Sequence, residues 1–293
     1  MKTLCFLNNK GGVGKTATVT TLSHMMATEY GKRVLVVDID PQHNTSARFS
    51  SSEWINIFLS IYKNENIDEG QPSIENILLD KNFDPHEAIR HTEYPNLDII
   101  PSYLTLSTCE EFIKADVVTP QQFRLRSQLK KVEDEYDFCL IDCSPSISIL
   151  NINALTSADE VYLPVRTDGD SCIGLAISLN LAKSVQEYNP SLKLGGVFLT
   201  QCNWQEGVAK TTYDFLSQVL AKETLIPIQI GNSKYLKENS FEQKPLLEVD
   251  SGKTKSMVTR AYLLLCEYIM AENKQAFLKK NKDRVNALKH LGA

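Results

Sequence analysis

The sequence predicts an α/β fold in which a mostly parallel, twisted sheet is covered by helices on both faces. The first observation is a series of short, continuously apolar runs rich in β-branched residues, which are typical of strands buried on both sides. The second is that helical patterns separate these runs, as the crossovers between parallel strands require. The third is a length of 293 residues without an internal repeat, which is enough to bury a large core.

The expected strands and helices alternate along the chain. The first strand, Thr3–Leu7, ends at a glycine-rich turn, and a helix follows from Lys15 to about Tyr30, where Gly31 ends it. Further strands are expected at Arg33–Asp40, Leu97–Pro101, Asp137–Cys143, Glu160–Val165 and Lys193–Thr200. Further helices are expected at Ser171–Glu187 and Gly207–Leu220.

The chain reads as a single domain over residues 1–273. Residues 50–71 are serine-rich at their start and lack a strong period, which predicts an insertion or surface subdomain. Residues 274–293 are predicted to form a basic, helical C-terminal tail.

The composition excludes several classes of protein. The formal net charge of −5 means that nucleic-acid binding would need a local basic patch. No apolar run approaches the roughly 18–20 residues of a membrane span. The 7 cysteines have no regular spacing and the 5 histidines no metal-ligand spacing, so neither a disulfide framework nor a zinc site is predicted. We therefore expect a reduced, cytoplasmic protein.

The stretch KGGVGKT (Lys10–Thr16) has the layout of a phosphate-binding loop. It lies between an expected strand and an expected helix, where glycines let backbone N–H groups approach phosphates and the helix N-terminus adds a partial positive charge. Lys15 is predicted to bind the β- and γ-phosphates, and the hydroxyl of Thr16 to bind Mg²⁺. The usual GxxxxGK[ST] pattern has glycine where this chain has Asn9. The predicted fold is therefore of the P-loop NTPase type.

Acidic residues end two of the expected strands. Asp38 and Asp40 are two residues apart, so on a strand both side chains would point to one face. Asp142 ends the apolar run FCLID. The carboxyl ends of parallel strands gather at one edge of the sheet, where ligands bind. Since phosphoryl transfer needs a carboxylate near its metal ion, the sequence predicts a site for Mg²⁺ and a nucleoside triphosphate at this edge.

Three motifs together resemble those of a known family: KGGVGKT (Lys10–Thr16), DIDPQHN (Asp38–Asn44) and IDCSPS (Ile141–Ser146). They look like the nucleotide motifs of the deviant Walker A ATPases, and within that group the chain is most similar to the ParA (Soj-like) partition ATPases. The similarity covers nearly the whole chain except the segment after Ser50 and the tail after about Asn273. The resemblance implies a homodimer around ATP and Mg²⁺ that hydrolyses ATP slowly in plasmid or chromosome partition. It also implies nonspecific DNA binding in the ATP state, hence nucleoid association, and stimulation by a ParB-like centromere-binding protein.

The resemblance assigns roles to single residues. The first lysine of the loop, Lys10, is expected to reach phosphates across the dimer interface, and Asp40 to orient the attacking water. The implied catalytic residues are Lys10, Lys15 and Asp40. The implied metal residues are Thr16, Asp38 and Asp142, with Asp142 acting on Mg²⁺ through water. The implied nucleotide contacts are Lys10, Gly11, Gly12, Val13, Gly14, Lys15, Thr16, Ala17 and, around the adenine, Asn203 and Pro227.

The chain departs from the family at three positions. Ala17 stands where most members have a hydroxyl residue that contacts the α-phosphate. Gly231 and Gln205 stand where Soj-like members carry arginines used for DNA. The candidate DNA contacts are therefore other cations: Lys234, Lys237, Lys279, Lys280, Lys282 and Arg284. Such contacts would hold phosphates without reading the sequence, and would weaken with salt.

The alternative function is a MinD-like positioning ATPase that binds membranes through its basic C-terminal tail. The tail carries apolar residues among its basic ones: Phe277, Leu278, Val285, Leu288 and Leu291. Their apolar face is sparse and interrupted, however, so we do not expect a membrane to be the partner.

Overall fold

The structure is a computed structural model that describes residues 1–49, 59, 62–63, 71–203 and 205–290. The predicted insertion at residues 50–71 lies almost entirely outside the described residues, as does Leu291 of the tail.

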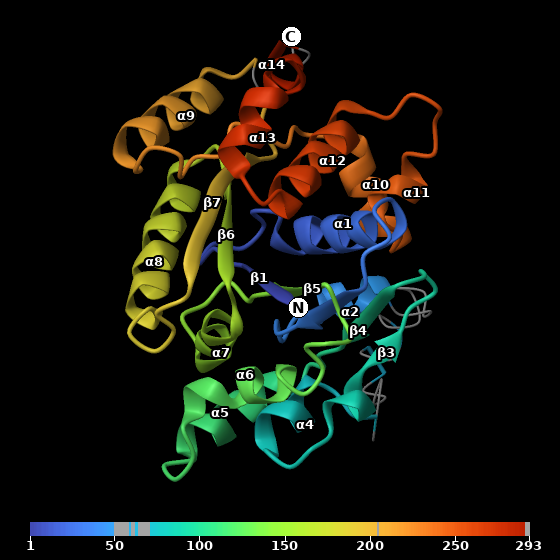
Figure 1. Cartoon of the computed structure of the whole chain (residues 1–293), viewed down its shortest axis with the longest axis vertical. Helices are drawn as coiled ribbons and strands as arrows, with labels where there is room; N and C mark the ends of the chain where they lie inside the picture. The colour runs from blue at the N-terminus through green and yellow to red at the C-terminus, as the bar shows by residue number, and fades with distance from the viewer. Residues whose placement is uncertain (50–58, 60–61, 64–70, 204, 291–293) are drawn as a thin grey trace.

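A seven-stranded sheet with the order β3–β4–β2–β5–β1–β6–β7 forms the centre of the described chain (Figure 1). All neighbouring strands are parallel except β3 and β4. The predicted fold class is therefore confirmed. The strands are β1 Lys2–Phe6, β2 Val34–Asp38, β3 Arg90–His91, β4 Leu97–Ile100, β5 Phe138–Asp142, β6 Glu160–Arg166 and β7 Lys193–Thr200.

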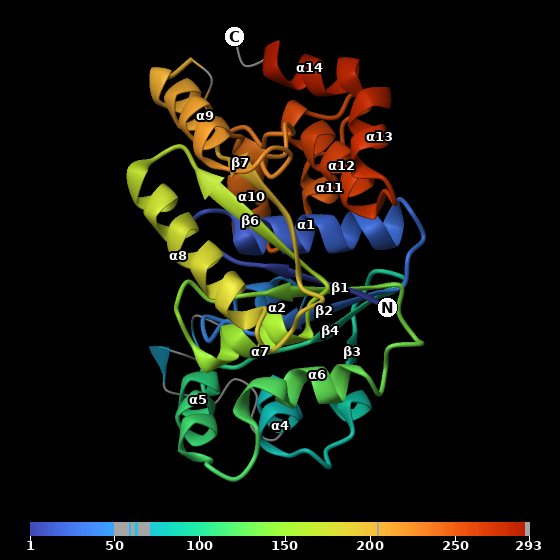
Figure 2. The same cartoon turned by 60° about the vertical axis from the view of Figure 1, so that its left-hand side comes forward.

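Helices cover both faces of the sheet, with α1 and α12 on one side and α4–α7 on the other (Figures 1 and 2). Those before β6 are α1 Lys15–Thr28, α2 Asn44–Phe49, α4 Ile74–Leu79, α5 Leu106–Ala115, α6 Arg124–Leu129 and α7 Ile149–Ser157. Those after it are α8 Gly169–Val185, α9 Gly207–Val219, α10 Lys234–Glu242, α11 Leu246–Val249, α12 Met257–Met270, α13 Lys274–Lys280 and α14 Lys282–His290. Short 3₁₀ turns lie at Pro85–Ala88 and Gln121–Phe123.

The strands are continuously apolar because both of their faces are buried. In β2, Val34 and Val36 pack into the core under α1 and α12, whereas Leu35 and Val37 pack into the core on the opposite face. All four side chains are fully buried. Helices on both faces remove the polar-apolar alternation that a half-exposed strand would show.

One expected strand is too long at its carboxyl end. The run Arg33–Asp40 forms a strand only over Val34–Asp38, so Asp40 lies beyond the ladder. The alternation of side chains along a strand therefore does not decide where Asp40 points. Its place is decided by the loop that follows, described with the site below.

The C-terminal tail packs on the core through both of its helices. Phe277, Leu278, Val285 and Leu288, the apolar residues considered for a membrane face, pack against the core on the α12 side. No helix among the described residues is long and apolar enough to span a membrane.

Two cations of the tail are engaged in ion pairs. Lys274 Nζ lies 2.7 Å from Glu160 Oε2, and Lys2 Nζ of the first strand lies 2.9 Å from the other oxygen of the same carboxylate. Arg284 Nη1 lies 2.6 Å from Glu267 Oε2. Arg284 was predicted as a DNA contact, but its charge is already balanced by a carboxylate of α12.

The buried His24 of α1 makes the stability of the fold depend on pH. Its ring packs edge-on against Tyr94, its Nδ1 has no partner among the described residues, and burial lowers its pKa to about 4. This pKa is below the value of about 6.5 in the unfolded chain, so the unfolded chain takes up a proton more readily as the pH falls. The free energy of unfolding is therefore at its full value above pH 6.5 and decreases as the pH falls toward 4. We expect His24→Gln to remove up to about 3 kcal/mol of this pH dependence.

The measurement is urea unfolding of both proteins at several pH values between about 7 and about 4.5. His91→Gln, at an exposed position, controls for the loss of an imidazole. Equal pH slopes for the wild type and His24→Gln would contradict the prediction.

Candidate active site

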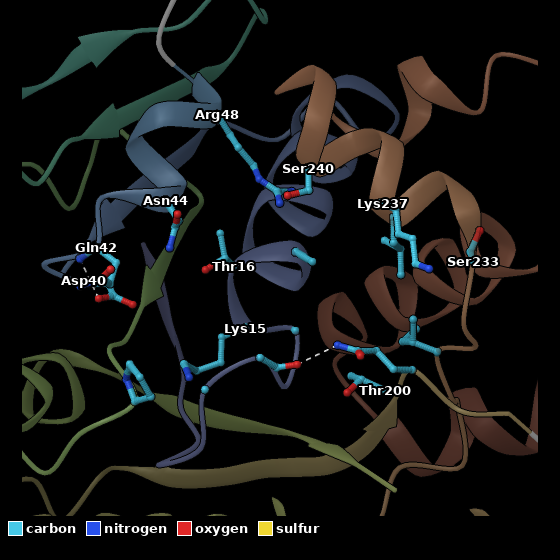
Figure 3. A pocket seen from close by; sticks show the side chains of 18 of the residues that line it. Lys15, Thr16, Asp40, Gln42, Asn44, Arg48, Thr200, Ser233, Lys237 and Ser240 are labelled. Carbon is cyan, nitrogen blue, oxygen red and sulfur yellow. Dashed lines mark hydrogen bonds between the residues drawn. The ribbon is translucent and has the colours of Figure 1, made fainter. Parts of the chain in front are cut away.

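A cavity of about 570 Å³ lies at the carboxyl edge of the sheet, between the glycine-rich loop and α10 (Figure 3). The expected phosphate-binding residues that line it are Gly11, Gly12, Gly14, Lys15, Thr16 and Ala17. Asp40 lines it from the loop after β2, and Thr200 and Gln201 from the end of β7. The cavity therefore lies where the sequence predicts a nucleotide site.

The glycine-rich loop has a conformation that only glycine adopts without strain. Gly12 and Gly14 have φ values of 74° and 87°, in the left-handed region. Thr200 Oγ1 donates to the carbonyl of Val13 at 2.7 Å, and Gln201 Nε2 donates to that of Gly12 at 2.8 Å (Figure 3). The end of β7 thus holds the loop in place. Val13 itself is fully buried and does not line the cavity.

Lys15 lies buried at the floor of the cavity. Its Nζ donates to the backbone carbonyls of Asn8 at 3.0 Å and Lys10 at 3.2 Å. Burial lowers its pKa, and the nearby charges of Asp142 and Asp40 oppose this shift. The ammonium group is therefore held by two neutral carbonyls and lies near two acids. Phosphate oxygens, which are charged, would form stronger hydrogen bonds with it than these carbonyls do.

Asp142 has one carboxylate oxygen in use and one without a partner. Its Oδ2 accepts from Thr16 Oγ1 at 2.8 Å and from Thr45 Oγ1 at 2.6 Å. Its Oδ1 is buried and has no hydrogen-bond partner among the described residues. Burial, followed by the charge of Asp38, raises the pKa of Asp142 to about 7. A buried acid with an unpartnered oxygen beside a threonine hydroxyl fits a divalent cation.

Asp38 lies directly opposite Asp142 in the β2–β5 ladder, but both of its oxygens are engaged. Oδ1 accepts from the N–H of Asp40 at 3.1 Å, and Oδ2 accepts from the N–H and hydroxyl of Ser46 at 2.8 and 2.7 Å. Asp38 thus fixes the loop that carries Asp40 and the start of α2. Burial is also the main reason that its pKa is raised, to about 6.

Asp40 is placed at the wall of the cavity by this loop. Its Oδ1 accepts from the N–H of Gln42 at 3.0 Å, and its carbonyl accepts from Ser102 Oγ at 3.0 Å. Burial raises its pKa, which the charge of Lys15 partly opposes. The structure therefore brings Lys15, Thr16 and Asp40 together at the cavity (Figure 3), and Asp142 lies behind Thr16, whose hydroxyl donates to it.

Comparison with known proteins identifies the family. The sequence profile described as "AAA domain" matches residues 1–194. The chain is 31% identical over 271 residues to the sporulation initiation inhibitor protein Soj of Bacillus subtilis, covering 92% of this chain and 98% of that protein. It is 34% identical over 241 residues to the chromosome-partitioning ATPase Soj of Treponema pallidum, covering 80% and 85%. The chain belongs to the Soj/ParA family.

Solved structures agree with this assignment at the level of the fold. A plasmid partition protein of Borrelia burgdorferi bound to AMPPNP superposes with a TM-score of 0.70 at 24% identity, covering 95% of this chain and 99% of that one. Cobyrinic acid a,c-diamide synthase of Mycobacterium smegmatis, with a bound ATP analogue and magnesium, superposes with a TM-score of 0.74 at 24% identity, covering 92% and 94%.

Lys10 of this Soj/ParA-family protein does not line the cavity of its own chain. Its Nζ lies 3.3 Å from Asp170 Oδ2 at the start of α8, and its side chain is 42% exposed. Its backbone N–H donates to Asn8 Oδ1 at 2.9 Å. The loop thus directs the two lysine side chains to different places, that of Lys15 into the cavity and that of Lys10 to the surface.

Some predicted residues lie elsewhere. Neither Asn203 nor Pro227, expected around the adenine, is among the described residues that line the cavity, and Asn203 Nδ2 donates instead to Glu206 Oε1 at 2.9 Å. Lys237, expected to contact DNA, lines the nucleotide cavity. The remaining DNA candidates all have exposed side chains: Lys234, Lys279, Lys280, Lys282 and Arg284, of which Arg284 is paired with Glu267.

Sequence reasoning missed the wall of the cavity opposite the sheet. This wall comes from α2, from α10 and the two residues before it, and from one residue of α12. Its residues are Asn44, Arg48, Asn232, Ser233, Ser240 and Tyr262. Asn44 belongs to the motif DIDPQHN, but no local pattern marks the other five as binding residues, because polar side chains on short helices are common at any surface. Thr200 and Gln201 could have been found, since they follow an expected parallel strand at its carboxyl end.

Gly174 of α8 allows this helix to pack closely on the start of the glycine-rich loop. A Cβ at this position would lie 2.6 Å from Asn8 Oδ1 and 3.0 Å from the backbone N of Lys10. We expect Gly174→Ala to lower the free energy of unfolding by about 1–3 kcal/mol, because backbone must move to make room. Urea unfolding measures this, and Gly169→Ala on the same helix, where a Cβ meets nothing within 4 Å, is the matched control. Equal stability of the two variants would contradict the close packing.

Proposed function

We propose that this chain is a Mg-ATP-dependent ATPase with slow intrinsic turnover, which acts as a switch in plasmid or chromosome partition. The observation that carries the proposal is that Lys15, Thr16 and Asp40 line one cavity while the buried Asp142 accepts a hydrogen bond from Thr16 behind it. The names of the relatives, which include a chromosome-partitioning ATPase and a chromosome partitioning protein, support the biological process.

Thr16 and Asp142 are the residues that would hold Mg²⁺, with Asp38 behind them. The unpartnered Oδ1 of Asp142 supports this assignment, since a buried carboxylate oxygen needs a cation or a donor. Bound Mg²⁺ would supply neutralisation of the phosphate charge. Asp38, whose oxygens already accept three hydrogen bonds, would orient the loop rather than bind directly.

Asp40 is proposed to orient the attacking water. It is 7% exposed, lines the cavity and accepts from the backbone N–H of Gln42, so its position is defined before a nucleotide binds. Lys15 and the N–H groups of the glycine-rich loop would stabilise the charge that develops on the transferred phosphoryl group. Catalysis by positioning and charge alone, with no covalent intermediate between protein and substrate, is consistent with a slow switch.

Lys10 is proposed to act in a homodimer around ATP. Its exposed position outside its own cavity supports a contact with phosphates bound by the second subunit. A two-fold arrangement makes this contact reciprocal, so ATP would favour the dimer and hydrolysis would release it. A ParB-like centromere-binding protein is the proposed trigger of turnover.

The ATP-bound dimer is proposed to bind DNA without preference for its sequence. The exposed lysines Lys279, Lys280 and Lys282 lie close together in sequence across the junction of α13 and α14, and Lys234 lies at the start of α10. Charges of this kind bind the phosphate backbone through counterion release. The packing of the tail's apolar residues on the core favours this assignment over a MinD-like membrane contact.

The proposed role of Asp40 predicts a loss of turnover without a loss of binding. We expect Asp40→Asn to lower the rate of ATP hydrolysis by roughly 100-fold, because a neutral amide orients the attacking water less strongly than a carboxylate does. The affinity for ADP should change by less than about threefold, since the residue acts at the γ-phosphate end. Steady-state phosphate release and calorimetric titration measure the two quantities. Asp214→Asn, at an exposed position on α9, is the control. Equal turnover in the wild type and Asp40→Asn would remove Asp40 from catalysis.

The proposed switch predicts DNA binding that depends on both nucleotide and salt. We expect binding with a slowly hydrolysed ATP analogue but not with ADP, and its loss in Lys10→Ala. Replacing Lys279, Lys280 and Lys282 by Gln should weaken binding and reduce the slope of log affinity against log salt by up to about 3. Fluorescence anisotropy with a duplex of arbitrary sequence measures this.

The matched control replaces three exposed lysines at the opposite end of the molecule, Lys81, Lys130 and Lys131, by Gln. If this variant loses as much affinity as the tail variant, the tail is not the contact. If no nucleotide state binds DNA but the ATP state binds anionic vesicles, the MinD-like alternative replaces the proposal.

A further inference from the structure

Arg48 enters the nucleotide cavity from α2, on the side away from Lys15 and Asp40 (Figure 3). The guanidinium group is held at two points, since Nη1 donates to Asn239 Oδ1 of α10 and contacts Thr20 Oγ1 of α1 at 3.5 Å. Neither partner is charged, and no described carboxylate forms an ion pair with Arg48. Among the described residues that line the cavity, Arg48 is therefore a partly buried cation with no carboxylate in direct contact.

The contact with Thr20 places this cation beside the second turn of α1, next to the turn that opens the helix. Thr20 follows Thr16 by four residues and Ala17 by three, so it lies one turn further along the same face of the helix. Its hydroxyl donates to the carbonyl of Thr16 at 2.8 Å. Thr16, Ala17 and Arg48 line the same cavity, which Arg48 enters at the end remote from Lys15 (Figure 3).

Ala17 leaves this part of the cavity without a side-chain donor. The resemblance to the ParA (Soj-like) ATPases implies a hydroxyl at this position that contacts the α-phosphate. A nucleotide whose terminal phosphates occupy the glycine-rich loop would bring its α-phosphate to the first turn of α1. An anion at that point needs a donor, and the methyl group of Ala17 cannot provide one.

We propose that Arg48 binds the α-phosphate of the nucleotide and replaces the hydroxyl contact that Ala17 cannot make. This inference rests on the proposed nucleotide-binding function of the cavity. A guanidinium makes charge-assisted hydrogen bonds to phosphate, which are stronger than those of a hydroxyl.

Asn239 is the positioning residue for this contact. It is fully buried, its Oδ1 accepts from Arg48, and its Nδ2 donates to the carbonyl of Lys244. The amide is therefore fixed by α10 and the residues after it, and it holds Nη1 while leaving the rest of the guanidinium for a ligand. Since α10 also carries Lys237 and Ser240 into the cavity, nucleotide binding and the position of α10 are linked through Arg48.

The test measures the affinity of Arg48→Gln for ATP, ADP, AMP and adenosine by calorimetric titration. The α-phosphate is common to the three nucleotides and absent from adenosine. We expect affinities for ATP, ADP and AMP to fall together by about 10- to 100-fold, and that for adenosine to change by less than about twofold. A merely structural role would weaken adenosine binding as well. Arg48→Lys, which keeps the charge, should retain more affinity than Arg48→Gln.

Restoring the family hydroxyl gives a second, independent arm. Ala17→Thr in the Arg48→Gln background should recover at least about threefold in ADP affinity, and it should gain less in the wild-type background. Arg260→Ala, an exposed arginine of α12 outside the cavity, should leave all four affinities unchanged. Thermal unfolding without nucleotide verifies that each variant is folded.

The outcomes separate this inference from the proposed function. If the wild type binds ATP and ADP but Arg48→Gln binds them equally well, or loses adenosine to the same extent, the role of Arg48 is wrong and the proposed function stands. If the wild type binds no nucleotide at all, both are wrong.

Discussion

The site depends on two carboxylates buried side by side, Asp38 and Asp142, at the ends of adjacent strands. Bringing two acids together away from water is unfavourable unless donors or cations surround them. Donors come from three places: the hydroxyl of Thr16 on α1, the start of α2 through Thr45 and Ser46, and the backbone at Asp40. The same contacts therefore draw two helix N-termini and the loop of Asp40 to one point. The cavity is the space left in front of them.

The parts of this arrangement that are local in sequence could be predicted from it. Apolar runs located six of the seven strands, because burial on both faces leaves mainly apolar residues within them. The short antiparallel strand Arg90–His91 has too few residues to form a pattern. Glycines with positive φ located the loop, since the backbone conformation itself demands them. The strand was expected to continue to Asp40 because apolar and acidic residues still alternate there, two residues after the hydrogen-bonded ladder ends.

The wall formed by α2, α10 and α12 could not be predicted, because it depends on contacts between segments far apart in the chain. Arg48 meets Asn239 across 191 residues, and Lys10 meets Asp170 across 160. Charge patterning treats Arg48 and Lys237 as ordinary surface cations, whereas the fold turns both toward the nucleotide cavity. The charge count of the tail likewise treats Arg284 as an unpaired cation. Its partner Glu267 lies on α12, outside the tail.

The shared carboxylate of Glu160 joins three segments that are far apart in the sequence. Lys2 of β1 and Lys274 of α13 bind opposite oxygens of this one side chain on β6. Beyond this junction, Phe277 and Val285 cover apolar surface on the α12 side of the core. The basic C-terminal segment is therefore part of the folded core, and a change in its length or sequence acts on the sheet itself.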